Sequence, residues 1–113
     1  MTTKEVAQMI DSIGLPNAYD HFTKKNSPGG PPYICFKYPS SENMFADDSV
    51  YQKIKLLRIE LYTDDKRFDL EEAVENALDA AGLCYDSDEE FIESEKMLMV
   101  TWETYVTITK GDT

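Results

Sequence analysis

Few side chains in this sequence could do catalytic chemistry, and they lie far apart. The 113 residues include one histidine, His21, and two cysteines, Cys35 and Cys84. A mechanism that needs two imidazoles is excluded, and a cysteine–histidine pair would require His21 to meet a cysteine from a distant segment. The sequence has no nucleophile elbow, phosphate-binding loop or dinucleotide-binding fingerprint. It therefore predicts a protein that is not an enzyme and has no cofactor.

Both cysteines stand in segments whose residue types favour strands, and neither belongs to a closely spaced pair. A disulfide needs an oxidising compartment, which nothing in the composition indicates. We expect Cys35 and Cys84 to be reduced and to serve as small buried side chains.

The run Asp86-Ser87-Asp88-Glu89-Glu90 resembles the opening of a calcium-binding loop, because it offers carboxylates at alternate positions. Such a loop also needs a glycine at its sharp turn and a bidentate glutamate at its twelfth position. The glycine is missing here, and the twelfth position is Met97. The sequence therefore predicts no metal site.

The chain is strongly acidic, with 22 aspartates and glutamates against 11 lysines and arginines and a formal net charge of -11. Binding to a nucleic-acid backbone needs a basic face, so sequence-specific recognition of nucleic acid is not expected. Three interpretations of the acid remain open: solubility, a surface past which DNA must move without sticking, and a mimic of DNA that occupies a DNA-binding enzyme. Composition alone does not separate them.

The length and composition indicate one domain with one core, since 42% of the 113 residues are hydrophobic. No apolar run approaches the roughly 20 residues that a membrane-spanning helix needs. No hydrophobic signal region follows the first residues. We expect a protein that stays in the cytoplasm and has no membrane contact.

Two strands are clearly predicted in the first half of the chain. Residues 33–38 are mostly aromatic and β-branched, and Pro39 is expected to end this strand. Further on, Leu57, Ile59 and Leu61 alternate with polar residues, which is the period of a strand with one buried face. We expect this second strand to be central to the fold.

Two amphipathic helices are predicted, one at the start of the chain and one after the central strand. The first spans residues 3–13, with a capping box formed by Thr2 and Glu5. Asp69 and Glu72 match the same motif at the start of the second helix. Its apolar side chains recur at helical spacing, at Leu70, Ala73, Val74, Ala77, Leu78 and Ala81.

Residues 40–50 are polar apart from Met44 and Phe45, and they predict a long loop. Loops of this length within a compact domain tend to be functional or mobile. Two interpretations remain open for Phe45: it folds back as a lid over the core, or it anchors a neighbouring subunit. In the second case Met44, Phe45 and Tyr51 form a subunit interface.

The last third of the chain predicts one irregular strand, over residues 83–87 and 90–93, and one regular strand over residues 96–110 with Trp102 toward the core. A weak edge strand is expected at residues 18–22. Together these elements predict an α+β fold, with one mostly antiparallel sheet and two helices packed on one face. The predicted core residues are Leu57, Ile59, Leu61, Val74, Leu78, Val100 and Trp102.

Several phrases of the sequence, taken in order, resemble those of one group of proteins. They are the opening TKEVAQMIDSIGLPNAYDHF, the Pro-Pro-Tyr entry into a strand that ends at Tyr38-Pro39, the segment VYQKIKLLRIELYTDDKRFDLEEAVENAL and the late FIESEKMLMVTWETYVTI. In these phrases the chain resembles small tail-region proteins of siphophages and prophages from Gram-positive bacteria, of the tail terminator or tail-completion type. The resemblance covers nearly the whole chain and rests on general order rather than on a catalytic signature.

The resemblance implies a small α+β subunit without catalysis that assembles as a ring, commonly hexameric, at the head-proximal end of the tail tube. Its partners would be further copies of itself and other tail-tube and head-completion proteins, first in the host cytoplasm during assembly and then in the virion tail. The resemblance transfers no individual functional residue. The alternative is an acidic inhibitor that mimics DNA. A mimic should display its acids in one continuous exposed stripe, whereas a ring subunit should carry apolar or aromatic residues on two opposite edges.

Overall fold

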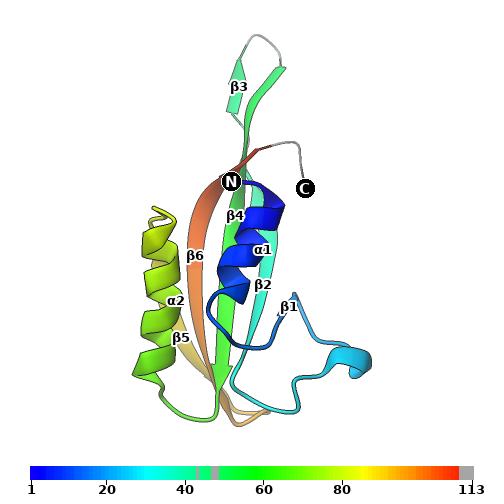
Figure 1. Cartoon of the computed structure of the whole chain (residues 1–113), viewed down its shortest axis with the longest axis vertical. Coiled ribbons are helices and arrows are strands. Elements are labelled where there is room, and N and C mark those ends of the chain that lie inside the picture. Colours follow the sequence, from blue (N-terminus) through cyan, green and yellow to red (C-terminus); the bar gives the residue numbers. More distant parts are fainter. Residues whose placement is uncertain (43, 47–48, 110–113) are drawn as a thin grey trace.

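A computed structural model describes residues 1–42, 44–46 and 49–109, with side chains in 1–42 and 53–109. In this part of the chain, helices occur near the start and after the long central strand, and strands fill most of the remainder (Figure 1). The elements in chain order are α1 (Thr3–Asp11), β1 (Asn17–Tyr19), the short 3-10 helix η1 (Lys24–Asn26), β2 (Tyr33–Ser41), β3 (Met44–Ala46), β4 (Ser49–Thr63), α2 (Phe68–Ala80), β5 (Asp86–Ile92) and β6 (Met97–Ile108).

The strands form one sheet in the order β1-β2-β4-β6-β5, and β3 pairs with the beginning of β4 outside this order. Neighbouring strands are antiparallel except for β1 and β2, which run parallel. After α2 the chain returns as β5 in the same direction as β4, with β6 between them. The predicted α+β fold with a mostly antiparallel sheet is confirmed.

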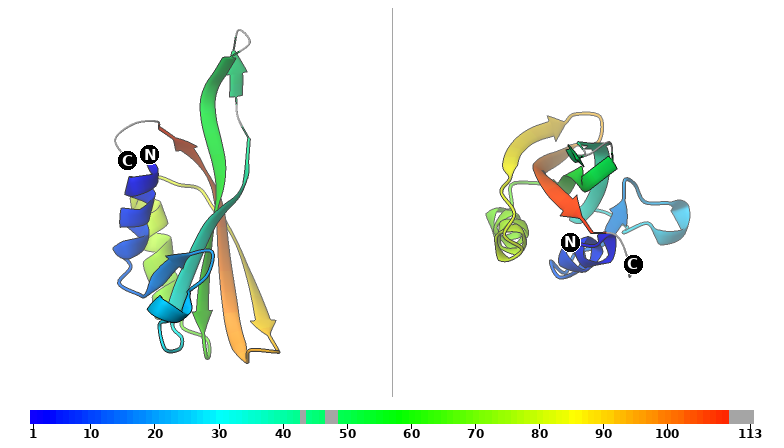
Figure 2. Two further views of the ribbon diagram at one scale, coloured as in Figure 1. Left: turned by 90° about the vertical axis from the view of Figure 1, so that its right-hand side faces the viewer. Right: turned by 90° about the horizontal axis from the view of Figure 1, so that it is seen from above.

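Both helices pack on the same face of the sheet, and the other face is open (Figure 2). The core lies between the helices and the sheet and confirms the predicted core residues. All its members are at most 5% exposed: Val6, Ile10, Ile34, Leu57, Ile59, Leu61, Val74, Leu78, Val100, Trp102 and Val106.

The pairing of β4 with β6 sets which residues enter this core. It runs from Lys53 opposite Ile108 to Thr63 opposite Leu98 without a shift in register. Trp102 on β6 faces the helices with no exposed surface, as predicted. Its indole Nε1 donates a hydrogen bond of 3.0 Å to the Oε2 of Glu75 on α2. The polar end of the largest core side chain is therefore satisfied, and the same bond ties α2 to the sheet.

A bulge lets β2 continue past Pro39, where the sequence predicted its end. Lys37 lies opposite Arg58 and Ser40 lies opposite Leu56, so two β2 residues, Tyr38 and Pro39, stand against one β4 residue. Proline lacks the N–H that a ladder needs, and a bulge is one of the few places in a sheet that accept it.

Residues 40–50 are therefore not one long loop, and that prediction is wrong. β2 runs to Ser41, the Glu42 N–H donates to the Ile54 carbonyl at 2.7 Å, and β3 then pairs with the start of β4. We call residues 40–42, 44–46 and 49–54 the hairpin arm. In Figure 1 it projects beyond the rest of the sheet, away from both helices. The polar composition misled the prediction because an arm that projects into water needs no buried face.

Two helix predictions need correction at their boundaries. The capping box of Thr2 and Glu5 is confirmed, but α1 ends at Asp11 rather than at Ile13. The predicted Asp69 cap on α2 is wrong, because the cap position is Arg67 and its side chain makes no capping bond. Asp69 lies inside the first turn, where its carboxylate pairs with the Arg67 guanidinium at 2.9 Å. A negative charge there still favours the helix N-terminus.

Two strand predictions also differ from the structure. β5 is continuous from Asp86 to Ile92 rather than interrupted by its acids. It is an edge strand whose residues are exposed on both faces, apart from the half-buried Ile92, so carboxylates remain in water without breaking the ladder. The predicted strand at residues 18–22 is the shorter β1, which ends at Tyr19 and is followed by Asp20 with a left-handed φ of 64°.

Replacing Trp102 with alanine should lower the free energy of unfolding by about 3–5 kcal/mol, because a fully buried aromatic side chain is lost. Chemical denaturation measures this directly. Tyr105→Ala is the matched control on the same strand, where the side chain is 57% exposed. A loss below about 1 kcal/mol for Trp102→Ala would show that the register of β6 is off by one residue.

Candidate interaction surfaces

The predicted interface residues belong to the hairpin arm and its base. Met44 and Phe45 lie in β3 and Tyr51 lies in β4, where the backbone pairs Met44 with Gln52 and Phe45 with Val50. The side chains of Met44, Phe45 and Tyr51 lie outside the described part of the chain. Their role in a subunit interface therefore stays a prediction.

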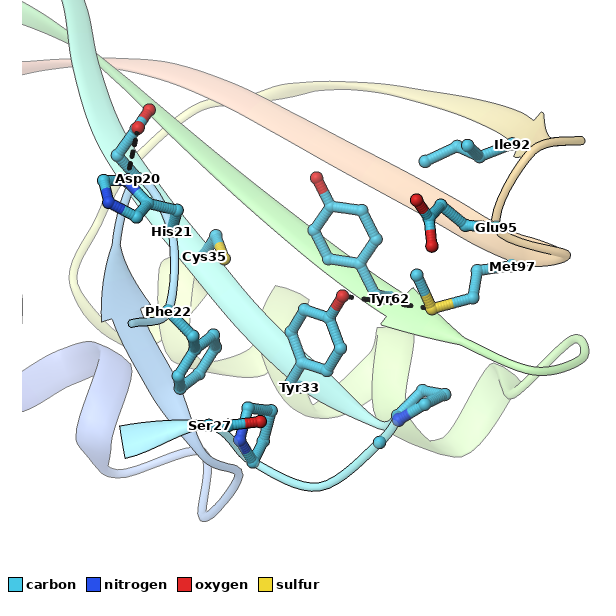
Figure 3. Close-up of a pocket in the computed structure, with 13 residues that line it drawn as sticks. Asp20, His21, Phe22, Ser27, Tyr33, Cys35, Tyr62, Ile92, Glu95 and Met97 are labelled. Carbon is cyan, nitrogen blue, oxygen red and sulfur yellow. Dashed lines mark hydrogen bonds and ion pairs between the residues drawn. The ribbon is translucent and has the colours of Figure 1, made fainter. Parts of the chain in front are cut away.

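A hollow of about 570 Å³ lies between the segment that follows β1 and the open face of the sheet (Figure 3). Its wall is aromatic: the Tyr33 and Tyr62 rings stack with centroids 5.0 Å apart, and Phe22 meets Tyr33 edge-on at 5.3 Å. The Tyr33 hydroxyl lies 3.9 Å from the sulfur of Met97. Burial raises the pKa of both phenols, and Glu60, which accepts a hydrogen bond from the Tyr62 hydroxyl, adds to the rise for Tyr62.

His21 and Cys35 line this same hollow, which the sequence did not predict. Their chemistry does not support a nucleophilic pair. Burial, followed by the nearby Glu60 carboxylate, raises the pKa of Cys35 to about 11, so the thiol stays protonated at neutral pH. The His21 Nδ1 contacts the Asp20 carboxylate at 2.9 Å instead. That contact, with the Lys37 ammonium at 3.4 Å, holds the pKa of Asp20 below its ordinary value.

The two cysteines differ in environment, and one of the two predictions about them is wrong. Cys35 is buried as expected, whereas Cys84 precedes β5 and is exposed. Its carbonyl accepts a hydrogen bond from the hydroxyl of Thr104, which is the polar residue that β6 buries beside the core. The backbone of Cys84 is thus fixed while its thiol faces water.

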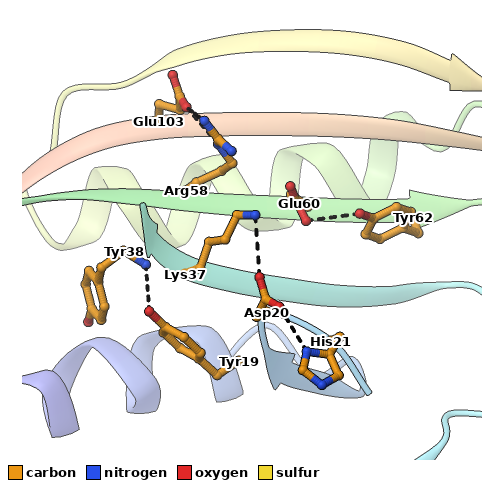
Figure 4. Close-up of polar contacts among 9 residues, drawn as sticks. All are labelled: Tyr19, Asp20, His21, Lys37, Tyr38, Arg58, Glu60, Tyr62 and Glu103. Atoms are coloured by element: carbon orange, nitrogen blue, oxygen red, sulfur yellow. Dashed lines mark hydrogen bonds and ion pairs between the residues drawn. The ribbon is translucent and has the colours of Figure 1, made fainter. Parts of the chain in front are cut away.

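The open face of the sheet is charged at its middle (Figure 4). Arg58 on β4 forms an ion pair of 2.7 Å with Glu103 on β6. A second hollow, of about 530 Å³, lies over these two residues and also contains Asp86, Asp88 and Glu90 of β5. The carboxylates of this face thus outnumber its cations, although the Arg58 guanidinium interrupts them.

The two edges of the sheet each carry an exposed aromatic side chain on the helix side. Tyr19 on β1 is 53% exposed and packs edge-on against Phe36, with centroids 5.5 Å apart. Phe91 on β5 is 49% exposed and lies opposite Leu98. Each of the two opposite edges therefore exposes an aromatic side chain.

In the residues that the structure describes, no three histidine, cysteine, aspartate or glutamate side chains are grouped to hold a metal ion. The described helices are also all too short or too polar to cross a membrane.

The sequence missed the aromatic hollow and the exposed aromatic edges. Tyr33 and Tyr62 lie directly opposite each other on β2 and β4. Alternation places both on the open face, but only the pairing register brings them together. Tyr19 and Phe91 could have been found only by knowing which strands are edges.

The fold resembles that of a chain from the virion of a native gene transfer agent particle. The TM-score is 0.56 at 15% sequence identity, and the match covers 93% of this chain and 88% of that chain. At this identity the comparison shows a shared fold. No protein-family model matches the sequence, and no curated protein matches it.

In the native protein Cys84 should react rapidly with an aromatic disulfide reagent at neutral pH, whereas Cys35 should react only as the protein unfolds. Exposure and the raised pKa of Cys35 are the reasons. Cys84→Ser should remove the fast phase, and Cys35→Ser should leave it. Two fast phases of equal amplitude in the wild type would contradict the burial of Cys35.

Proposed function

We propose that this protein is a structural component of a phage or phage-like particle and not an enzyme. The observation that carries the proposal is the fold shared with a virion chain over 93% of this sequence. The chemistry is consistent with it, because the one histidine lies against Asp20 and the buried thiol is held protonated. A carboxylate can orient a histidine as a base, but among the described residues no hydroxyl or thiol is hydrogen-bonded to His21.

More specifically, we propose a tail terminator or tail-completion subunit that forms a ring at the head-proximal end of the tail tube. A ring subunit needs two different contact surfaces, because head-to-tail contacts join unlike patches. The aromatic edges at Tyr19 and Phe91 supply two such surfaces. The acidic open face suits a passage for DNA that must not bind, since like charge repels the phosphate backbone.

The hairpin arm is the third proposed contact. We propose that Met44, Phe45 and Tyr51 contact a neighbouring subunit. The backbone pairing of β3 with β4 supports this, because it holds the arm out from the sheet, where it can reach another copy (Figure 1).

A DNA mimic is the second candidate, and the acids of β5 favour it. Asp86, Asp88 and Glu90 share one face of this edge strand. An ion pair on the same face opposes it, since Arg58 pairs with Glu103, which lies opposite Asp86. This cation interrupts the continuous stripe that a mimic requires, so we propose the ring subunit as the better supported function.

Inactivating the gene in the phage or prophage that carries it should produce tails of irregular length or tails that do not join heads. Electron microscopy of the particles measures this, and mass spectrometry of purified wild-type particles should detect the chain. A frameshift complemented from a plasmid is the control. If the particles never contain the chain and keep normal tails, the proposal is wrong, and inhibition of a DNA-binding enzyme would then favour the mimic.

Phe45→Ser should weaken self-association by about 30-fold, since a buried interface aromatic contributes about 2 kcal/mol. Light scattering over a protein concentration series measures the change. Phe68→Ser is the matched control, because Phe68 is 72% exposed at the start of α2 and belongs to none of the proposed surfaces. An equal loss in both variants would remove Phe45 from the interface.

A further inference from the structure

The charge of this chain is unevenly divided between the two edges of the sheet. Residues 17–32, which form the β1 edge, contain two lysines and one aspartate. Residues 84–95, which form the β5 edge, contain six acids and neither lysine nor arginine. The formal charge of -11 therefore conceals a basic edge and an acidic edge.

The exposed charges on these edges are available for contacts. Lys24 and Lys25 in η1 are exposed, and in the described part of the chain neither forms an ion pair. Asp88 and Glu90 on β5 are also exposed, and the ion pairs nearby involve Glu89 and Glu93 instead. Figure 2 shows η1 and the end of β5 at the same end of the molecule, on opposite sides.

The geometry of the sheet also allows the two edges to meet. β1 runs parallel to β2, and three antiparallel steps separate β2 from β5, so β1 and β5 run in opposite directions. Copies rotated about an axis along the strands would place β5 of one antiparallel to β1 of the next. Tyr19 and Phe91 would then lie on the same side of the joined sheets, because each is on the helix side of its own edge.

We propose that a second copy of this chain docks edge to edge, with the acidic β5 edge of one subunit against the basic β1–η1 edge of the next. The inference rests on the proposed ring and names the surfaces that close it. Lys24 and Lys25 face Asp88 and Glu90 of the neighbour, and the exposed aromatics supply apolar area beside these charges. The contact is heterologous, so each subunit uses both edges.

Salt should affect this contact in two opposing ways. At about 0.01 M the screening length is about 30 Å, and the whole charge of -11 repels its copies. At about 0.15 M it falls to about 8 Å, which leaves mainly the attraction across the contact. At about 1 M it is about 3 Å and that attraction is lost. Association should therefore be greatest at intermediate salt, whereas a purely apolar contact would strengthen steadily.

Charge reversal of one edge at a time tests the pairing. Lys24→Glu with Lys25→Glu puts acids on both sides of the proposed contact, and Asp88→Lys with Glu90→Lys puts lysines at the facing positions on both sides. Each variant alone should associate at least about tenfold more weakly than wild type at 0.15 M salt. An equimolar mixture should associate again, because each edge of one variant then meets an opposite charge on the other.

Sedimentation velocity measures the masses, and melting curves confirm that each variant folds. Glu72→Lys with Asp79→Lys on the exposed face of α2 is the control for Asp88→Lys with Glu90→Lys, because it makes the same change in charge away from both edges. The inference is wrong if the variants alone keep the wild-type mass, if the control weakens association equally, or if the mixture stays unassociated. Because these measurements use purified protein, their result is independent of whether the chain occurs in particles.

Discussion

The unshifted pairing of β4 with β6 is the constraint on which the rest of the structure depends. It places Leu57, Ile59 and Leu61 on the helix side together with Val100 and Trp102. A slip of β6 by one residue would turn Val100 and Trp102 toward water and put Glu103 under the helices. The hydrogen bond from the Trp102 indole to Glu75 favours the same register, because the donor reaches this acceptor only when Trp102 faces the helices. The same pairing determines which residues lie on the open face, because the side chains of β4 and β6 that do not enter the core point to that side.

The sequence predicts the core well because burial leaves a periodic trace. Alternation identified the inward residues of β4 and β6, and helical spacing identified Val74 and Leu78. The hairpin arm projects beyond the part of the sheet that the helices cover, so the core imposes no period on its residue types. Pro39 in turn suggested an end where the chain makes a bulge. The start of α2 was misplaced for a similar reason: Asp69 is a suitable capping residue, but its carboxylate pairs with Arg67 instead. Local propensity predicts which residue types suit a position, but it does not determine which group each side chain contacts.

For the surfaces the limit is different. Counting residues excluded an enzyme with two imidazoles, but it could not predict that His21 and Cys35 would line one hollow, nor that burial would keep the thiol protonated. The total charge likewise does not show how the charged residues are distributed between the two edges of the sheet. Lys24 and Lys25 lie far in sequence from Asp88 and Glu90, and only the strand order puts these pairs at opposite edges. A single formal charge suggests repulsion between copies, whereas the strand order turns the same residues into two complementary sides.

The bulge at Tyr38 and Pro39 also separates the hairpin arm from the body of the sheet, so the length of one can vary independently of the other. Insertions of one residue in each strand beyond the bulge would lengthen the hairpin arm and leave the alignment of β2 with the body of β4 unchanged. Because side chains alternate along a strand, one such insertion turns the side chains of the outer arm to the opposite face, and two insertions restore the original face. Related chains could thus differ in reach by steps of about 7 Å while keeping the same core. The length of the arm could then change without any change to the domain that carries it.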